Sequence, residues 1–273
     1  MSEGFTKKKK YGQNFLTSDR IPARIAAESG ITPECGVLEI GPGLGVLTAQ
    51  LISAAKKTVA VEIDGELIPR LEARFAGCDG LTLIHADIMD IDLKHLAEEQ
   101  FSEMPVCVCA NLPYYITTPI LMKLFESGVK FRTITVMVQK EVAKRLCSRC
   151  GSPDYGSITA AISRYASVRK LFDVKAGSFS PPPKVDSAVV RFDLYKEPLF
   201  SPADEHTYTA VLRAAFAQRR KTLLNSLGAI FPDKDALKEM IAAENLKADV
   251  RGEAVPPEKL CNIADRIYSV KQE

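Results

Sequence analysis

Short apolar runs alternate with longer amphipathic segments over the first half of the chain. The segments between the runs have helical length and period. Alternation of strand and helix patterns predicts a mostly parallel sheet with helices on both faces, which is an α/β fold. The apolar runs of strand length occupy residues 36–40, 58–63, 81–85, 106–110 and 133–138.

Helix and hairpin signals extend this pattern. Residues 18–30 predict a helix, and "TPILMKLFESG" predicts another in which Thr118 caps and Pro119 takes the first helical position. Two later β patterns, 171–177 and 187–195, enclose "SFSPPPKVD" and predict an antiparallel hairpin at the edge of the sheet.

The pattern changes along the chain in a way that predicts its domains. Residues 1–17 are basic and irregular, and we interpret them as an N-terminal arm. Residues 18–198 carry the strand and helix alternation of one domain. Past Tyr195 the strand signal ends, so 199–273 predict a small C-terminal helical domain.

Composition excludes some classes of protein. Hydrophobic residues make up 46% and charged residues 26% of the chain, as in ordinary globular proteins. The apolar runs are too short for a membrane span. Seven cysteines stand at no framework spacing, which favours a reducing, cytoplasmic location. Since the net charge is only +2, attraction to nucleic acid requires local clusters such as Lys7, Lys8, Lys9 and Lys10.

A glycine-rich turn, "LEIGPGLGVLT", joins the first strand to a helix. Glycines at 41, 43 and 45 let the backbone turn sharply and approach a ligand, although a tight turn with nothing bound has the same pattern. A dinucleotide fingerprint requires glycine at position 46, where this chain has Val46. The turn, behind Glu39, therefore favours S-adenosylmethionine, an adenosine cofactor without phosphates.

Acidic residues end the next two strands. Glu62 can accept hydrogen bonds from both ribose hydroxyls, and Asp87 can accept one from an adenine amino group. Each alone is also compatible with a helix cap or a solvated loop end. The carboxyl ends of parallel strands meet in one crevice, so we expect Gly41, Gly43, Glu62 and Asp87 to converge on a cofactor.

The fourth strand ends in "NLPYYITTP". Pro113 biases Leu112 toward an extended conformation, so the Leu112 carbonyl and the Asn111 side-chain oxygen can accept both protons of an adenine amino group. Tyr114 offers a ring for stacking of a flipped-out base. The pattern predicts catalysis mainly by positioning and fixed dipoles. A strand-to-loop turn with two buried tyrosines is the structural alternative.

Five stretches together carry a family resemblance: "GQNFL", "LEIGPGLGVLT", "NLPYYITTPIL", "SFSPPPKVDSAVVRF" and "FAQRRKTLLNSL". They closely resemble the small-subunit ribosomal RNA adenine dimethyltransferase family. The resemblance implies a Rossmann-like class I methyltransferase sheet and a monomer. It implies dimethylation of N6 of two adjacent adenosines in the 3′-terminal hairpin loop of 16S RNA. Four S-adenosylmethionine molecules are then used, late in assembly of the small subunit or its precursor.

The resemblance also implies roles for residues outside the strand ends. It places Asn14 and Leu16 over the cofactor. Phe179 is similar to a second aromatic face for the target base, although a core residue at a hairpin tip fits the same pattern. We expect two basic clusters to contact RNA, with a solvated charged face or a disordered tail as the alternatives: Lys8, Lys9 and Lys10, and Arg219, Arg220 and Lys221 at a helix start.

One feature departs from the family pattern. Cys147 and Cys150 form a CxxC pair without a partner cluster, and the three histidines have no ligand spacing, so we predict no metal.

Three rival functions remain open. A nicotinamide dehydrogenase is disfavoured by Val46. A large-subunit RNA adenine methyltransferase is disfavoured by "FAQRRKTLLNSL" and "SPPPKVDS". A non-catalytic RNA-binding assembly factor is disfavoured by the intact "NLPY" stretch, although an assembly role is compatible with activity.

Overall fold

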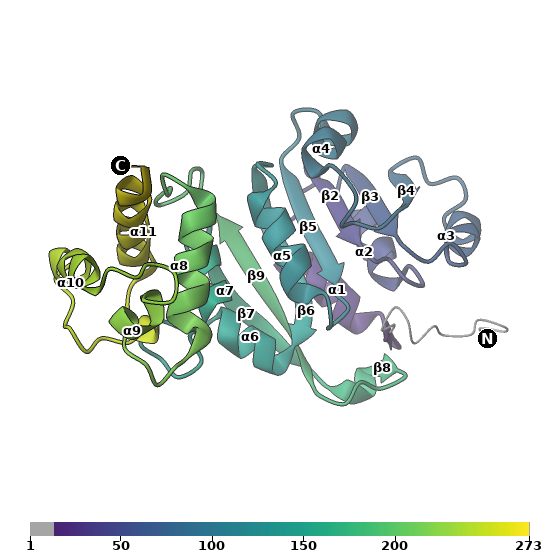
Figure 1. Ribbon diagram of the computed structural model, residues 1–273. Coiled ribbons are helices and arrows are strands. Elements are labelled where there is room, and N and C mark those ends of the chain that lie inside the picture. The colour runs from purple at the N-terminus through teal and green to yellow at the C-terminus, as the bar shows by residue number, and fades with distance from the viewer. Residues whose placement is uncertain (1–13, 273) are drawn as a thin grey trace. The chain divides into compact units, whose positions relative to one another are not determined.

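The computed structural model describes residues 14–272 and contains a seven-stranded sheet (Figure 1). The strands of this sheet are β2 (Gly36–Ile40), β3 (Lys57–Glu62), β4 (Leu81–His85), β5 (Val106–Asn111), β6 (Phe131–Gln139), β7 (Ala166–Val174) and β9 (Ser187–Leu194). Their order is β4-β3-β2-β5-β6-β9-β7. The five strands from β2 to β6 are parallel, and β9 is antiparallel to β6. The α/β fold class is confirmed.

Strands β2 to β6 form within two residues of their expected bounds. All five residues of β2 are buried, and so are the first five of β5. Continuous burial is typical of parallel strands with helices on both faces, and it explains why these strands are continuous apolar runs. The chain leaves β2 toward β3 and β4 on one side and continues with β5 on the other, so a crevice opens beyond the carboxyl ends of β2 and β5.

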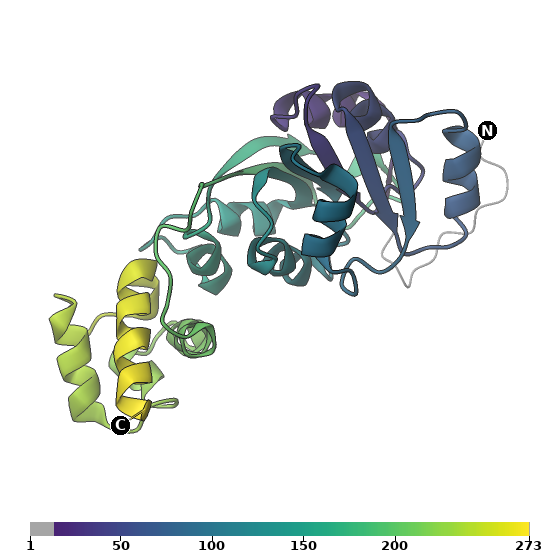
Figure 2. The same cartoon turned by 90° about the horizontal axis from the view of Figure 1, so that it is seen from above.

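Helices cover both faces of this sheet (Figures 1 and 2). The helices are α1 (Arg20–Glu28), α2 (Val46–Ala54), α3 (Ile68–Arg74), α4 (Leu93–Phe101) and α5 (Thr117–Glu126). On one face, Ile25 of α1 and Leu51 of α2 share a buried cluster with Cys107 of β5. On the other face, the ring of Phe125 in α5 lies 5.3 Å from the ring of Phe192 in β9.

The start of α5 differs from the expectation. Ile116 occupies the N-cap position, so Thr118 is the second helical residue and Pro119 the third. The Ile116 N–H donates to the Pro113 carbonyl at 3.2 Å, and this turn leads directly into the helix. The prediction of Thr118 as the cap is wrong because the first helical hydrogen bond, from the Ile120 N–H to the Ile116 carbonyl at 3.1 Å, begins two residues earlier.

The predicted edge strands are confirmed as neighbours, with β7 at the edge of the sheet. The segment between them adds a 3₁₀ turn, η2 (Ala176–Ser178), and a second, two-stranded sheet. In this sheet β1 (Phe15–Leu16) pairs antiparallel with β8 (Phe179–Ser180). The pairing anchors the start of the described chain beside the glycine turn, because the Phe15 ring reaches Gly43.

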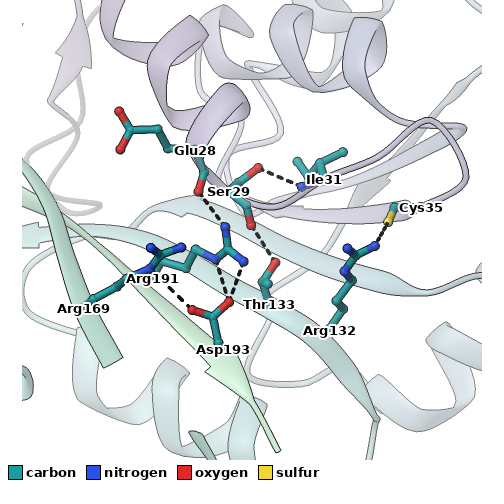
Figure 3. A network of polar contacts seen from close by, with 9 residues as sticks. All are labelled: Glu28, Ser29, Ile31, Cys35, Arg132, Thr133, Arg169, Arg191 and Asp193. Atoms are coloured by element: carbon teal, nitrogen blue, oxygen red, sulfur yellow. Dashed lines mark hydrogen bonds and ion pairs between the residues drawn. The ribbon is translucent and has the colours of Figure 1, made fainter. Parts of the chain in front are cut away.

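A polar network fastens the end of α1 to β6 and β9 (Figure 3). Arg191 of β9 donates from Nη1 to the Glu28 carbonyl at 3.0 Å and from Nε to Asp193 Oδ1 at 2.9 Å. The hydroxyl of Thr133 in β6 donates to the Ser29 carbonyl at 2.8 Å. These donors satisfy carbonyls that the end of a helix leaves without partners, and so they hold α1 on the sheet.

The chain divides into two compact units. Among the described residues, the first takes in those up to Ala143 and Val168–Leu194. The second takes in Lys144–Ser167 and the residues from Tyr195 onward. The expected boundary, which assigned 18–198 to one domain, therefore differs from the structure at 144–167 and at 195–198.

The second unit has its own core, which explains this difference. Tyr155 and Ala160 are buried in one cluster with Tyr208, Leu223 and Ile263. A linear reading of the strand pattern misses such packing because the residues concerned are far apart in the chain. The helical elements of this part are α6 (Lys140–Leu146), which crosses the boundary, α7 (Ser157–Ile162), α8 (Glu205–Ala217), α9 (Leu223–Leu227), α10 (Lys234–Ala243), η3 (Gly252–Ala254) and α11 (Pro257–Gln272). Within residues 14–272, no helix has the length and apolar character needed to cross a membrane.

Replacing Gly252 with alanine is expected to destabilise the second unit by about 3 kcal/mol. A Cβ at Gly252 would lie 2.2 Å from the backbone oxygen of Ala215, and backbone cannot move aside as a flexible side chain can. Thermal unfolding followed by circular dichroism measures the loss. Gly228→Ala is the matched control, because its Cβ would meet the nearest atom at an ordinary 3.5 Å. Equal melting temperatures for the two variants would contradict this packing.

Candidate active site

A pocket lies at the carboxyl ends of β2, β3 and β5. It encloses about 830 Å³ of space, part of which is open solvent. Backbone and side chains from the glycine turn, the start of the described chain and the "NLPY" corner form its walls. The lining residues are Asn14, Phe15, Leu16, Glu39, Gly41, Pro42, Gly43, Leu44, Val46, Leu47, Glu62, Ile63, Asn111, Leu112, Pro113 and Tyr114.

Glu62 connects the loops that follow β2 and β3. Its Oε2 accepts from the Gly43 N–H at 3.0 Å, and its Oε1 accepts from the Asp64 N–H at 2.9 Å. Gly43 has φ +58°, a conformation that other residues rarely adopt, and a Cβ there would lie 3.0 Å from the Phe15 ring. Burial raises the pKa of Glu62, while these two backbone amides oppose the shift. The carboxylate thus holds the shape of the glycine turn.

Glu39 is a buried carboxyl group in the pocket wall that sequence reasoning did not select as a site residue. It is 1% exposed, and neither of its oxygens has a hydrogen-bond partner within the described part of the chain. Burial raises its pKa to about 8, the nearby Thr48 hydroxyl opposes the shift without meeting the geometry of a hydrogen bond, and Glu62 adds to it. A buried acceptor without a partner requires a ligand or a proton. The signal in the sequence was a lone charged residue inside the apolar run "GVLEI".

Asn111 is the last residue of β5 and lines the pocket. Its Nδ2 donates to the carbonyl of Asn14 at 3.2 Å. Since a carbonyl can only accept, this contact fixes which end of the amide is the –NH₂ group. Oδ1 is thereby left as the acceptor that the side chain offers to the pocket.

The other residues of the corner are held by their own contacts. The Leu112 N–H donates to the Met137 carbonyl at 3.3 Å. The Tyr114 hydroxyl lies 2.6 Å from Ser187 Oγ at the start of β9, and burial raises its pKa. The Pro113 carbonyl accepts from the Thr117 hydroxyl at 3.1 Å. The corner is therefore positioned by β6, β9 and α5.

The structure brings together most of the predicted cofactor residues. Asn14, Leu16, Gly41, Gly43 and Glu62 all line the pocket with Asn111. Phe15 also lines it, and sequence reasoning missed this residue. An alternation of side chains across β1 was the available signal, but a strand of two residues is too short to reveal it.

Two predicted residues do not line the pocket. Asp87 follows β4 by two residues, and its Oδ1 accepts from the Met89 N–H at 2.8 Å, as a turn-forming aspartate does. Phe179 is 3% exposed and packs in the cluster that contains Ile25 and Val189. Phe179 pairs with Leu16 of β1, which lines the pocket, so its role as a second face for the base stays a prediction.

The basic residues expected to contact RNA have different positions. Lys8, Lys9 and Lys10 lie outside the described residues. Arg219 donates from Nη2 to the Tyr155 carbonyl at 3.2 Å and from Nη1 to the Pro153 carbonyl. Arg219 thus uses its guanidinium to hold a loop of its own unit, and its contact with phosphate stays a prediction.

Arg220 and Lys221 follow Arg219 in the chain, and all three are exposed. Arg220 and Lys221 precede α9 instead of starting it, because Thr222 is the N-cap.

Cys150 is exposed, and its thiol lies 3.7 Å from the Glu253 carbonyl. Within residues 14–272, no group of three or more His, Cys, Asp or Glu residues could hold a metal ion. The prediction that the protein needs no metal stays a prediction.

Comparisons with known proteins show the family of this chain. The model of the family described as "Ribosomal RNA adenine dimethylase" matches residues 4–269. A protein of Shouchella clausii named ribosomal RNA small subunit methyltransferase A is 42% identical, over 97% of this chain and 91% of its own. A protein of the same name from Geobacillus thermodenitrificans is 45% identical, over 87% of this chain and 82% of its own.

Two solved structures have the same architecture. A dimethyladenosine transferase from Plasmodium falciparum has a TM-score of 0.77 at 24% identity, over 91% of this chain and 95% of its own, which shows the shared fold. The 23S rRNA methyltransferase ErmE has a TM-score of 0.69 at 26% identity, over 93% of this chain and all of its own. With the family model matched over almost the whole length, the chain belongs to the ribosomal RNA adenine dimethylase family.

Proposed function

We propose that the protein transfers methyl groups from S-adenosylmethionine to N6 of two adjacent adenosines in small-subunit ribosomal RNA. We further propose that these lie in the 3′-terminal hairpin loop of 16S RNA, that four cofactor molecules are used, and that the reaction is late in assembly. The observation that carries the proposal is the fixed amide of Asn111, whose Nδ2 donates to Asn14 and leaves Oδ1 as an acceptor in the pocket. The names of the relatives support the small subunit as the substrate.

The pocket fits S-adenosylmethionine in its charge and its shape. Glu39 has two buried oxygens without partners within residues 14–272, and such a group suits the cationic amino acid part of the cofactor. A Cβ at Gly41 would meet nothing within 4 Å, so open space adjoins the backbone there. Glu62 lies at the end of β3, where its carboxylate would accept from ribose hydroxyls. The cofactor supplies a methyl group made electrophilic by the sulfonium.

The residues of the corner then act on the adenine amino group. Asn111 Oδ1 and the Leu112 carbonyl accept hydrogen bonds from its two N–H groups. This favours a pyramidal nitrogen with its lone pair directed at the methyl carbon. Asn111 is neutral, so it places no competing negative charge beside the sulfonium. Tyr114, fixed by Ser187, stacks on the base that has left the RNA helix. The chain needs no strong base here, because an N-methylated adenine cation loses its proton readily.

Binding of the cofactor is expected to release up to about one proton near pH 7. In the free protein Glu39 has a pKa of about 8 and is mostly protonated at this pH. A cationic group beside it lowers the pKa, so affinity rises with pH and levels off above about 8. Calorimetry in two buffers of different ionisation enthalpy counts the proton, and Glu39→Gln serves as the control. Equal proton release by the wild type and by this variant would exclude Glu39 as the source.

Transfer of labelled methyl groups to purified ribosomal subunits tests the proposed function. We expect label in unmethylated small subunits and N6,N6-dimethyladenosine in the nucleosides detected by mass spectrometry. The fold shared with ErmE makes the large subunit the second candidate substrate. Label in large subunits alone would favour that candidate, and no label in either would refute the enzymatic proposal.

We also propose that the second unit contacts RNA through Arg220 and Lys221, which are both exposed. Their replacement by alanine is expected to weaken binding uniformly across RNA sequences and to reduce its salt dependence. Binding titrations at two salt concentrations measure this. Arg213→Ala, at an exposed cation of α8, is the control, and an unchanged salt slope would place the RNA elsewhere.

A further inference from the structure

Tyr115 is an exposed aromatic residue directly beside the proposed adenine pocket. It is 63% exposed, whereas the hydroxyl of the preceding Tyr114 is bound to Ser187. Within residues 14–272, Tyr115 and Tyr195 are the only exposed large aromatic side chains, and Tyr195 belongs to the second unit. In the first unit, therefore, the most exposed ring stands next to the site of chemistry.

The backbone around Tyr115 holds it in place. The turn from Pro113 to Ile116 is closed by a hydrogen bond of 3.2 Å, and α5 follows immediately. Because the backbone is already fixed, only the side chain of Tyr115 becomes ordered when a flat partner covers it. Tyr114 lines the pocket and Tyr115 lies outside it. The two consecutive rings can therefore contact two successive groups of a ligand.

We propose that Tyr115 stacks on the nucleotide next to the adenosine held in the pocket. This inference rests on the proposed function and deepens it by assigning a residue that binds the substrate RNA beside the reacting base. Bases of single-stranded RNA stack on exposed aromatic rings, and such stacking needs no hydrogen-bond readout. If the two target adenosines are adjacent, Tyr115 receives the second adenine while the first is methylated.

Kinetics with unmethylated small subunits test the proposal. Tyr115→Ala is expected to raise KM for the subunit about 10-fold and to change kcat by less than about twofold, as loss of one stacked base would. Tyr115→Phe, which keeps the ring, is expected to restore the wild-type KM. The matched control is Tyr195→Ala. A wild-type KM for Tyr115→Ala, or equal impairment of the Ala and Phe variants, would overturn the proposal.

Fluorescence gives a readout that does not depend on catalysis. The chain contains no tryptophan, so Tyr115→Trp introduces a single reporter. We expect an oligoribonucleotide with two adjacent adenosines to quench this fluorescence, and the same oligonucleotide with one abasic site to quench it less. Tyr195→Trp is the control. Absence of quenching would overturn the role of Tyr115, whereas failure of the wild type to methylate any subunit would instead overturn the proposed function.

Discussion

Replacing Asn111 by alanine is expected to lower kcat for methyl transfer about 1000-fold, within the range found when one preorganised polar group is removed from an active site. The truncation removes the Oδ1 acceptor, so the adenine amino group loses one of the two partners that orient its lone pair. We expect the affinity for S-adenosylmethionine to change by less than about threefold, because Glu39 and Glu62 carry the proposed cofactor contacts. Single-turnover kinetics and calorimetry measure the two effects separately.

A matched control separates this effect from the loss of an ordinary hydrogen bond. Asn262→Ala in the second unit also removes an amide that donates a hydrogen bond, to Glu244 Oε2 at 2.9 Å. Both variants are expected to lose about 1 kcal/mol of folding free energy, and only the Asn111 variant to lose transfer. Full turnover by Asn111→Ala would remove the proposed mechanism. Equal loss of cofactor affinity and of transfer would move Asn111 to a binding role.

Replacing Glu62 by alanine is expected to weaken cofactor binding about 100-fold, equivalent to about 3 kcal/mol. The change leaves two N–H groups, of Gly43 and Asp64, without the carboxylate that now joins them. It also removes the acceptor proposed for the ribose hydroxyls. Glu62→Gln is expected to have an intermediate effect, because one side of an amide cannot accept from an N–H. Calorimetric titration with S-adenosylmethionine measures the series.

The control for this series is Glu28→Ala. Glu28 forms an exposed ion pair with Arg24 at 2.6 Å, and such pairs contribute little to stability. We expect the Glu28→Ala variant to bind the cofactor with the affinity of the wild type. If Glu62→Ala retained wild-type affinity, the pocket beside the glycine turn would not be the adenosine site.

Much of the fold could be predicted because buried parallel strands need continuous apolar runs. The runs at 36–40 and 106–110 appear as β2 and β5 almost residue for residue. The glycine turn, Glu62 and Asn111 were also predictable, since polar or glycine residues at the ends of apolar strands have few structural reasons to be there. The rule that parallel strands deliver their carboxyl ends to one edge then brought them together.

Contacts between residues far apart in the chain could not be predicted from the sequence. Phe179 follows a hairpin signal that fits a core position and a pocket wall equally, and only the structure shows its ring buried in the cluster that contains Ile25. Arg219 belongs to a basic run, and only the structure shows that its guanidinium donates to the carbonyl of Tyr155, which lies 64 residues away in the chain. Residues 144–167 follow the last parallel strand but pack in the second unit.

The amino-acid sequence by itself determined the sheet, the turn and the strand-end residues, because local periodicity and strand direction suffice to specify them. Only the tertiary structure decided the orientation of the Asn111 amide, the isolation of Glu39 from hydrogen-bond partners and the exposure of Tyr115. These properties depend on which distant groups approach each side chain, such as the Asn14 carbonyl at Asn111. The pattern of residues along the chain does not specify these contacts between distant residues.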